Sequence, residues 1–169
     1  MGLLLFLLVW VVSFLYHASL SFIGQVFDVM SMYLLSTFII LYNLSRRFII
    51  KPLTFTLTYI IANVILGYII VKIPESRRLI FAISLLVGLL LEIWLRLRKE
   101  SKAQTSLLIL SVVAFATAYI VWIIDRYKIW CDPESWLQGH AMWHLMSAIA
   151  AGLVYLYYRS ERPLFKEGL

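Results

Sequence analysis

Two histidines, His140 and His144, stand four residues apart in the apolar stretch GHAMWHLMSA. This spacing places both imidazoles on one face of a helix, as is required when one helix supplies two ligands to a metal. Because an imidazole is costly to remove from water, a pair inside a membrane helix indicates a shared partner. The third histidine of the chain is His17. Three neutral imidazoles with a fourth position open to water form the donor set of a catalytic zinc site.

A carboxylate and a hydroxyl accompany these histidines. Asp28 is the first acidic residue of the chain, and an intramembrane carboxylate usually has a cationic or metal partner. Beside a zinc-bound water, Asp28 could accept a proton and return it to a leaving group. Ser13 precedes His17 by one helical turn, and its hydroxyl could donate to a developing oxyanion or to Asp28. The alternative for Ser13 is a bond to its own helix backbone, which is common in membrane helices.

The elements that must position these residues are membrane helices. Hydrophobic residues make up 63% of the chain and charged residues 14%, which is more apolar surface than a soluble domain of this size can bury. Six segments have the roughly 20 mostly apolar residues that a transmembrane helix needs. They are residues 3–20, 26–45, 52–72, 78–96, 104–125 and 137–158. The sequence therefore predicts an all-α integral membrane protein, a bundle of about six transmembrane helices in a single domain over residues 1–169.

Two other features of the sequence bear on this prediction. The segment 3–20 could instead be a signal peptide, although it lacks the basic residues that usually precede the apolar core of one. Cys131 is the one cysteine of the chain, so no intrachain disulfide can form.

The basic residues predict the orientation in the membrane. The net charge is +6, but the Lys and Arg residues lie in short loops between apolar segments, which is typical of anchoring to membrane lipids and not of binding to nucleic acid. Ten of them lie on the side of both termini and five on the other, so we expect both termini in the cytoplasm. His17, Asp28, His140 and His144 then share a depth near the periplasmic, lumenal or outer face.

Three further residues have ordinary structural interpretations. Glu92 can form an i,i+4 pair with Arg96 at a cytoplasmic helix end, with both side chains reaching toward water. Asp125 is expected in a solvated outer loop, where it could still line the entrance above the site. Trp143, between the two histidines, either lines the pocket or faces lipid.

The segments SFLYHASLSFIGQVFD (13–28) and LQGHAMWHL (137–145) resemble the alkaline ceramidase family. This family belongs to a superfamily of membrane hydrolases that also includes the progestin and adipoQ receptors. Its marks are a serine and a histidine on one helix, an aspartate on the next helix, and a late H-x3-H motif. The eleven-residue step from His17 to Asp28 is similar to the ceramidase branch, since the receptor branch has a longer step.

The resemblance implies a zinc-dependent amidase that cleaves ceramide, entering from the bilayer, into a sphingoid base and a fatty acid. His17, His140 and His144 would hold zinc, Asp28 would transfer the proton, and Ser13 would stabilise the oxyanion. Members of the family usually have seven helices, so the chain is expected to lack the first one.

Two alternatives to this hydrolase stay open. A zinc-containing receptor or scaffold of the same superfamily would bind metal without turnover. A small proton-coupled transporter would use its His and Asp side chains as a relay, but the titratable residues cluster at one depth and form no path across the membrane. Haem is disfavoured, because adjacent turns of one helix cannot supply opposite axial ligands.

Overall fold

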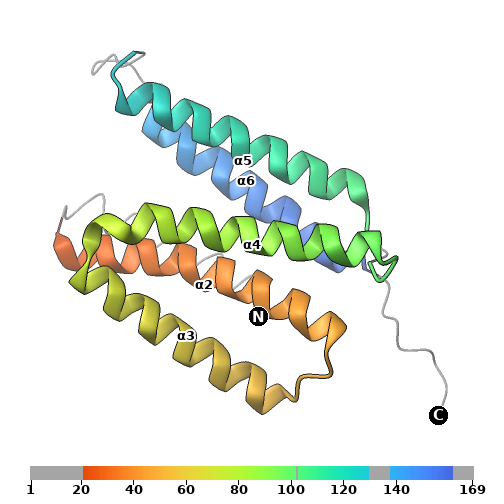
Figure 1. Ribbon diagram of the computed structural model, residues 1–169. Helices are drawn as coiled ribbons and strands as arrows, with labels where there is room; N and C mark the ends of the chain where they lie inside the picture. Colours follow the sequence, from red (N-terminus) through yellow and green to blue (C-terminus); the bar gives the residue numbers. More distant parts are fainter. Residues whose placement is uncertain (1–20, 102, 130–137, 162–169) are drawn as a thin grey trace, which may run out of the picture. The chain divides into compact units, whose positions relative to one another are not determined.

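The computed structural model describes residues 21–101, 103–129 and 138–161, and over these residues it is helical with connecting turns and loops. Its elements are α2 (Phe22–Arg47), α3 (Pro52–Lys72), the short 3-10 helix η1 (Pro74–Ser76), α4 (Arg77–Leu97), α5 (Thr105–Arg126) and α6 (Gly139–Arg159) (Figure 1). The described part of the chain has five helices that are long and apolar enough to cross a bilayer. The chain is therefore an all-α, multi-pass membrane protein, as its hydropathy predicts. The expected segment 3–20 lies outside the described residues.

The starts of α2 and α3 follow from local chemistry. Pro52 begins α3, where its fixed φ suits a helix and its missing N–H is not needed. Ser21 caps α2, with its Oγ accepting a hydrogen bond of 3.1 Å from the Gly24 N–H. Because of this cap the helix starts at Phe22, whereas hydropathy alone predicts a start at residue 26. Asp28 consequently lies in the second turn of α2.

Residues 21–101 belong to one compact unit, in which α2 packs against both α3 and α4 (Figure 1). Two tyrosines join these helices through backbone carbonyls. The Tyr33 hydroxyl of α2 donates to the Arg77 carbonyl at 2.8 Å, and the Tyr59 hydroxyl of α3 donates to the Leu34 carbonyl at 3.0 Å. Such bonds hold helices together in lipid, where apolar burial between helices provides little driving force.

Two asparagines make further contacts within this unit. Asn63 Nδ2 of α3 donates to Thr37 Oγ1 of α2 at 2.9 Å, and Asn43 Nδ2 of α2 donates to the Gly88 carbonyl of α4 at 3.0 Å. A Cβ at Gly88 would lie 2.9 Å from Ile39 Cγ2. The close approach of α2 and α4 at this point therefore depends on glycine, as is typical of membrane helix interfaces.

A buried ion-pair network completes the contact between α2 and α4. Arg46 Nη1 of α2 donates to Glu92 Oε2, while Arg96 Nε lies 3.7 Å from Glu92 Oε1. The pair with Arg96 that the sequence predicts is confirmed, but its solvated character is wrong, since Glu92 is only 1% exposed. The difference arises because α2 covers this face of α4 and supplies a second cation, which compensates the buried carboxylate.

The described residues 103–129 and 138–161 belong to a second compact unit, in which α5 and α6 lie side by side (Figure 1). Gly139, Ala150 and Tyr157 of α6 are buried and recur on one helical face with Trp143. The Trp143 ring centroid lies 5.6 Å from that of Phe115 on α5. The single domain over residues 1–169 stays a prediction.

Candidate metal centre

The two histidines of α6 direct their ring nitrogens toward each other. His140 lies in the first turn and His144 in the second turn of the helix, and both side chains are partly buried. Their Nε2 atoms are 3.2 Å apart. The rings meet edge to face, with centroids 4.8 Å apart and planes at 82°. The nitrogens thus converge on a small region beside the helix.

This separation fits two ligands on one zinc ion. Zinc–nitrogen bonds of about 2.0–2.1 Å at a tetrahedral angle place two ligand nitrogens about 3.3–3.4 Å apart, and the observed distance is 3.2 Å. Neutral imidazole nitrogens suit zinc, copper, iron and nickel, whereas calcium and magnesium prefer oxygen. The donor set and its spacing therefore fit the expected metal.

The contact between α5 and α6 fixes the start of the histidine helix. A Cβ at Gly139 would lie only 2.6 Å from Asp125 Cβ, so a side chain at Gly139 cannot be accommodated without a shift. Asp125 ends the expected segment 104–125 and belongs to the last turn of α5, where it packs against Gly139. Its expected place in a solvated loop is therefore wrong. The residue after Gly139 is His140, so this contact sets its height relative to α5.

Aromatic packing sets the rotation of α6. Trp143 contacts Phe115, Tyr119 and Trp122 of α5, with ring centroids 5.6, 6.4 and 6.1 Å away. Successive helical residues are about 100° apart around the axis, so the face that carries His140 and His144 is turned by about that angle from the stripe that contacts α5. Trp143, which could have lined a pocket or faced lipid, contributes to the α5–α6 interface.

Asp28 lies in the other unit of the chain. It belongs to the second turn of α2, is partly buried, and its backbone carbonyl accepts a hydrogen bond of 2.6 Å from Ser31 Oγ. Ser13 and His17 lie outside the described residues. Within the described ranges no three His, Cys, Asp or Glu side chains gather at one point. The structure therefore brings together His140 and His144, and the roles of the other site residues stay predictions.

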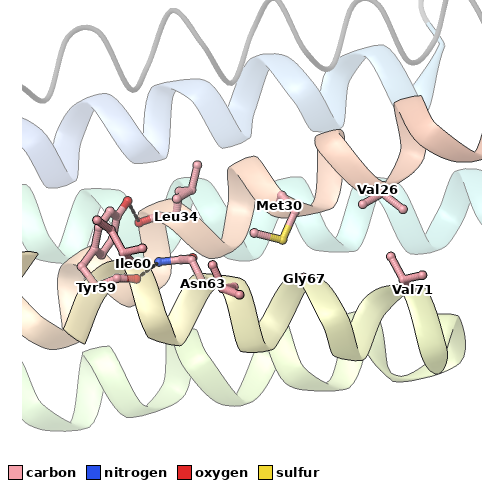
Figure 2. A pocket seen from close by; sticks show the side chains of 9 residues that line it. Val26, Met30, Leu34, Tyr59, Ile60, Asn63, Gly67 and Val71 are labelled. Carbon is pink, nitrogen blue, oxygen red and sulfur yellow. Dashed lines mark hydrogen bonds between the residues drawn. The ribbon is translucent and has the colours of Figure 1, made fainter. Parts of the chain in front are cut away.

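A groove of about 430 Å³ lies between α2 and α3 (Figure 2). Its walls are formed by Val26, Met30 and Leu34 of α2 and by Asn63, Gly67 and Val71 of α3, among others. Its polar side chains form hydrogen bonds within the protein. Asn63 donates to Thr37 Oγ1, and the Tyr59 hydroxyl donates to the Leu34 carbonyl. The groove is otherwise apolar and offers no group for chemistry.

The fold and the histidine pair define a polytopic helical membrane protein with a candidate metal centre at the start of one helix. A family model described as Ceramidase matches residues 1–163. The chain belongs to this family, which makes it a ceramidase-like hydrolase of the membrane with a lipid substrate in the bilayer. The resemblance carried by the two ends of the sequence is thereby confirmed. Comparison with curated proteins and with solved structures finds no match.

Proposed function

We propose that the protein is a zinc-dependent amidase that hydrolyses ceramide, or a closely related lipid amide, to a sphingoid base and a free fatty acid. The observation that carries the proposal is the 3.2 Å separation of the Nε2 atoms of His140 and His144. Membership of the Ceramidase family supports the class of reaction, and the membrane-spanning helices support a substrate that enters from the bilayer.

Three histidines would hold the metal in this proposal. His140 and His144 supply two nitrogens from one helix, and His17 supplies the third. When bound, zinc provides a Lewis acid that activates water near neutral pH and polarises the amide carbonyl. With both termini in the cytoplasm, as the basic residues predict, the site opens toward the periplasm, the lumen or the exterior.

Two residues of the protein would transfer the protons and stabilise the developing negative charge. Asp28 accepts a proton from the attacking water as the water oxygen bonds to the carbonyl carbon. Ser13 donates a hydrogen bond to the carbonyl oxygen while that oxygen carries negative charge. Asp28 then gives its proton to the departing nitrogen as the carbon–nitrogen bond breaks. The products are a fatty acid and an amine, and the carboxylate is regenerated.

The histidine distance has a second explanation, which the experiment must separate from metal binding. One Nε2–H could donate a hydrogen bond to the other ring at the same distance. Purified protein in detergent is therefore analysed for zinc and given ceramide, and zinc content and fatty acid release are compared for the parent, His140→Ala and the control Ser84→Ala. Ser84 donates to its own backbone at the Ile80 carbonyl, so its loss should leave activity near the parent value.

We expect release from the parent and from Ser84→Ala, and a loss of at least a hundredfold in His140→Ala, since a histidine ligand is removed. A zinc-containing parent that releases no fatty acid would contradict the amidase and favour the receptor or scaffold. Undiminished release from His140→Ala would contradict the role of the histidines.

A further inference from the structure

Ser147 of α6 has a hydroxyl whose hydrogen bonding is unusual for this protein. Its Oγ atom is buried and has no hydrogen-bond partner in the described part of the chain. Other helical hydroxyls donate to a backbone carbonyl three or four residues earlier, as in Ser31 to Asp28, Ser84 to Ile80, Ser111 to Leu108 and Thr117 to Val113. Because an unsatisfied buried hydroxyl costs free energy, its presence points to a ligand that completes the bond.

The position of Ser147 connects this hydroxyl to the histidine pair. Ser147 follows His144 by three residues and His140 by seven, so all three lie within about 60° of one another around the helix axis. At a rise of about 1.5 Å per residue, Ser147 lies about 4.5 Å farther along α6 than His144. Ser147 therefore lies on the same face of α6 as the histidine pair.

We propose that Ser147 is a specificity-determining residue that hydrogen-bonds a hydroxyl group of the lipid substrate. The proposal rests on the proposed function, which places the scissile amide at the histidine pair. A hydroxyl within a few covalent bonds of that amide fits the span from His144 to Ser147. A sphingoid base carries two such groups, one on each carbon next to the one that bears the amide nitrogen, and we assign to Ser147 the secondary hydroxyl on the side of the long chain. A lipid amide without this hydroxyl would leave Ser147 unsatisfied and bind less well.

The test compares ceramide with an otherwise identical amide that lacks this hydroxyl. The ratio of the two kcat/KM values is measured for the parent, Ser147→Ala, Ser147→Thr and Ser111→Ala. Ser111 of α5 is the matched control, because its hydroxyl donates to the Leu108 carbonyl at 2.7 Å. Zinc content is measured in each variant, to show that the histidine pair is undisturbed.

We expect Ser147→Ala to lower kcat/KM for ceramide by about 10–100-fold and to change it little for the deoxy amide. Ser147→Thr retains a hydroxyl and should keep most of the preference, and Ser111→Ala should keep the parent ratio. Equal losses on both substrates, or no loss on either, would overturn the proposal, because the hydroxyl would then serve the packing of α6 or bind water.

A binding measurement separates this proposal from the proposed function. The shift in thermal unfolding midpoint caused by each lipid is recorded in detergent with the same four proteins. The parent could lack amidase activity while ceramide stabilises it more than the deoxy amide does. If Ser147→Ala removes that difference, the proposed amidase function is contradicted and the proposed Ser147 site is supported. If the parent hydrolyses both lipids at equal rates and both give equal shifts in the unfolding midpoint, the proposed Ser147 site is contradicted and the proposed amidase function is supported.

Discussion

Asp125 at the end of α5 packs directly against Gly139 at the start of α6, with only 2.6 Å between Asp125 Cβ and the position that a Cβ on Gly139 would take. The contact lies one residue before His140, so it links the packing of the second unit to the geometry of the candidate metal centre. A ligand helix must be held at a fixed height if its first-turn histidine is to meet a metal, and this glycine permits the necessary approach.

Gly139→Ala should damage both stability and metal binding. The added methyl group clashes with Asp125 near its backbone and not with the end of a flexible side chain, so we expect a loss of about 1–3 kcal/mol in the free energy of unfolding. The shift of His140 should weaken zinc binding by about tenfold. Thermal unfolding and competition with a chelator measure the two effects.

The matched control is Gly152→Ala on the same helix, where an added Cβ meets nothing within 4 Å. That substitution should leave zinc affinity unchanged and raise stability by about 0.5–1 kcal/mol, because alanine favours helix over glycine. Equal behaviour of the two alanine variants would show that the contact with Asp125 does not position the histidine helix.

Removing the buried carboxylate of Glu92 should destabilise the first unit strongly. Glu92→Ala leaves the Arg46 guanidinium, whose side chain is 10% exposed, without its main counter-charge, and we expect a loss of about 3–5 kcal/mol. The control is Glu100→Ala. Glu100 pairs with Arg47 at 3.7 Å, where the side chains are 33% and 42% exposed, so its loss should cost about 0–1 kcal/mol. Unfolding by denaturant in detergent compares the two, and similar losses would contradict the buried network.

Asp28→Asn separates proton transfer from metal binding. The amide has nearly the shape of the carboxylate but cannot accept a proton, so we expect zinc content near that of the parent and a fall in kcat of about 10²–10⁴-fold. Fatty acid release and metal analysis on the same preparation give both values. Full activity in this variant would refute the role of Asp28 in moving the proton.

Chelation distinguishes the amidase from a proton-coupled transporter. Stripping the metal should abolish fatty acid release and lower the unfolding midpoint, since metal binding contributes to the stability of the folded state. Zn²⁺ should restore both properties and Mg²⁺ should not, because Zn²⁺ binds imidazole nitrogen well whereas Mg²⁺ prefers oxygen ligands. Activity that persists without metal would contradict a zinc-dependent reaction.

The sequence predicts the described helices well because each is a long apolar segment that ends at charged residues or proline. The expected start of 52–72 coincides with Pro52 in α3. The start of α2 is missed, because Ser21 acts through a cap that hydropathy does not register. The partner of Glu92 is missed for another reason. Arg46 lies 46 residues away in the chain, and the contact depends on how α2 packs against α4.

The candidate site is predicted in part for similar reasons. The i,i+4 spacing places His140 and His144 on one face, and the structure brings their nitrogens to 3.2 Å. The sequence does not indicate a role for Ser147, nor does it predict the contact of Asp125 with Gly139. The sequence shows the spacing of Ser147 from the two histidines, but a helical serine normally bonds to its own backbone. Only the structure shows that this hydroxyl is unsatisfied.

The most direct test of the account is the zinc content of detergent-purified protein, measured for the parent and for the variant His140→Ala/His144→Ala. The account predicts about one zinc per parent chain and almost none in the folded variant, because two of the three ligands are lost. A well-folded parent without zinc, or a double variant that keeps its full zinc content, would contradict it.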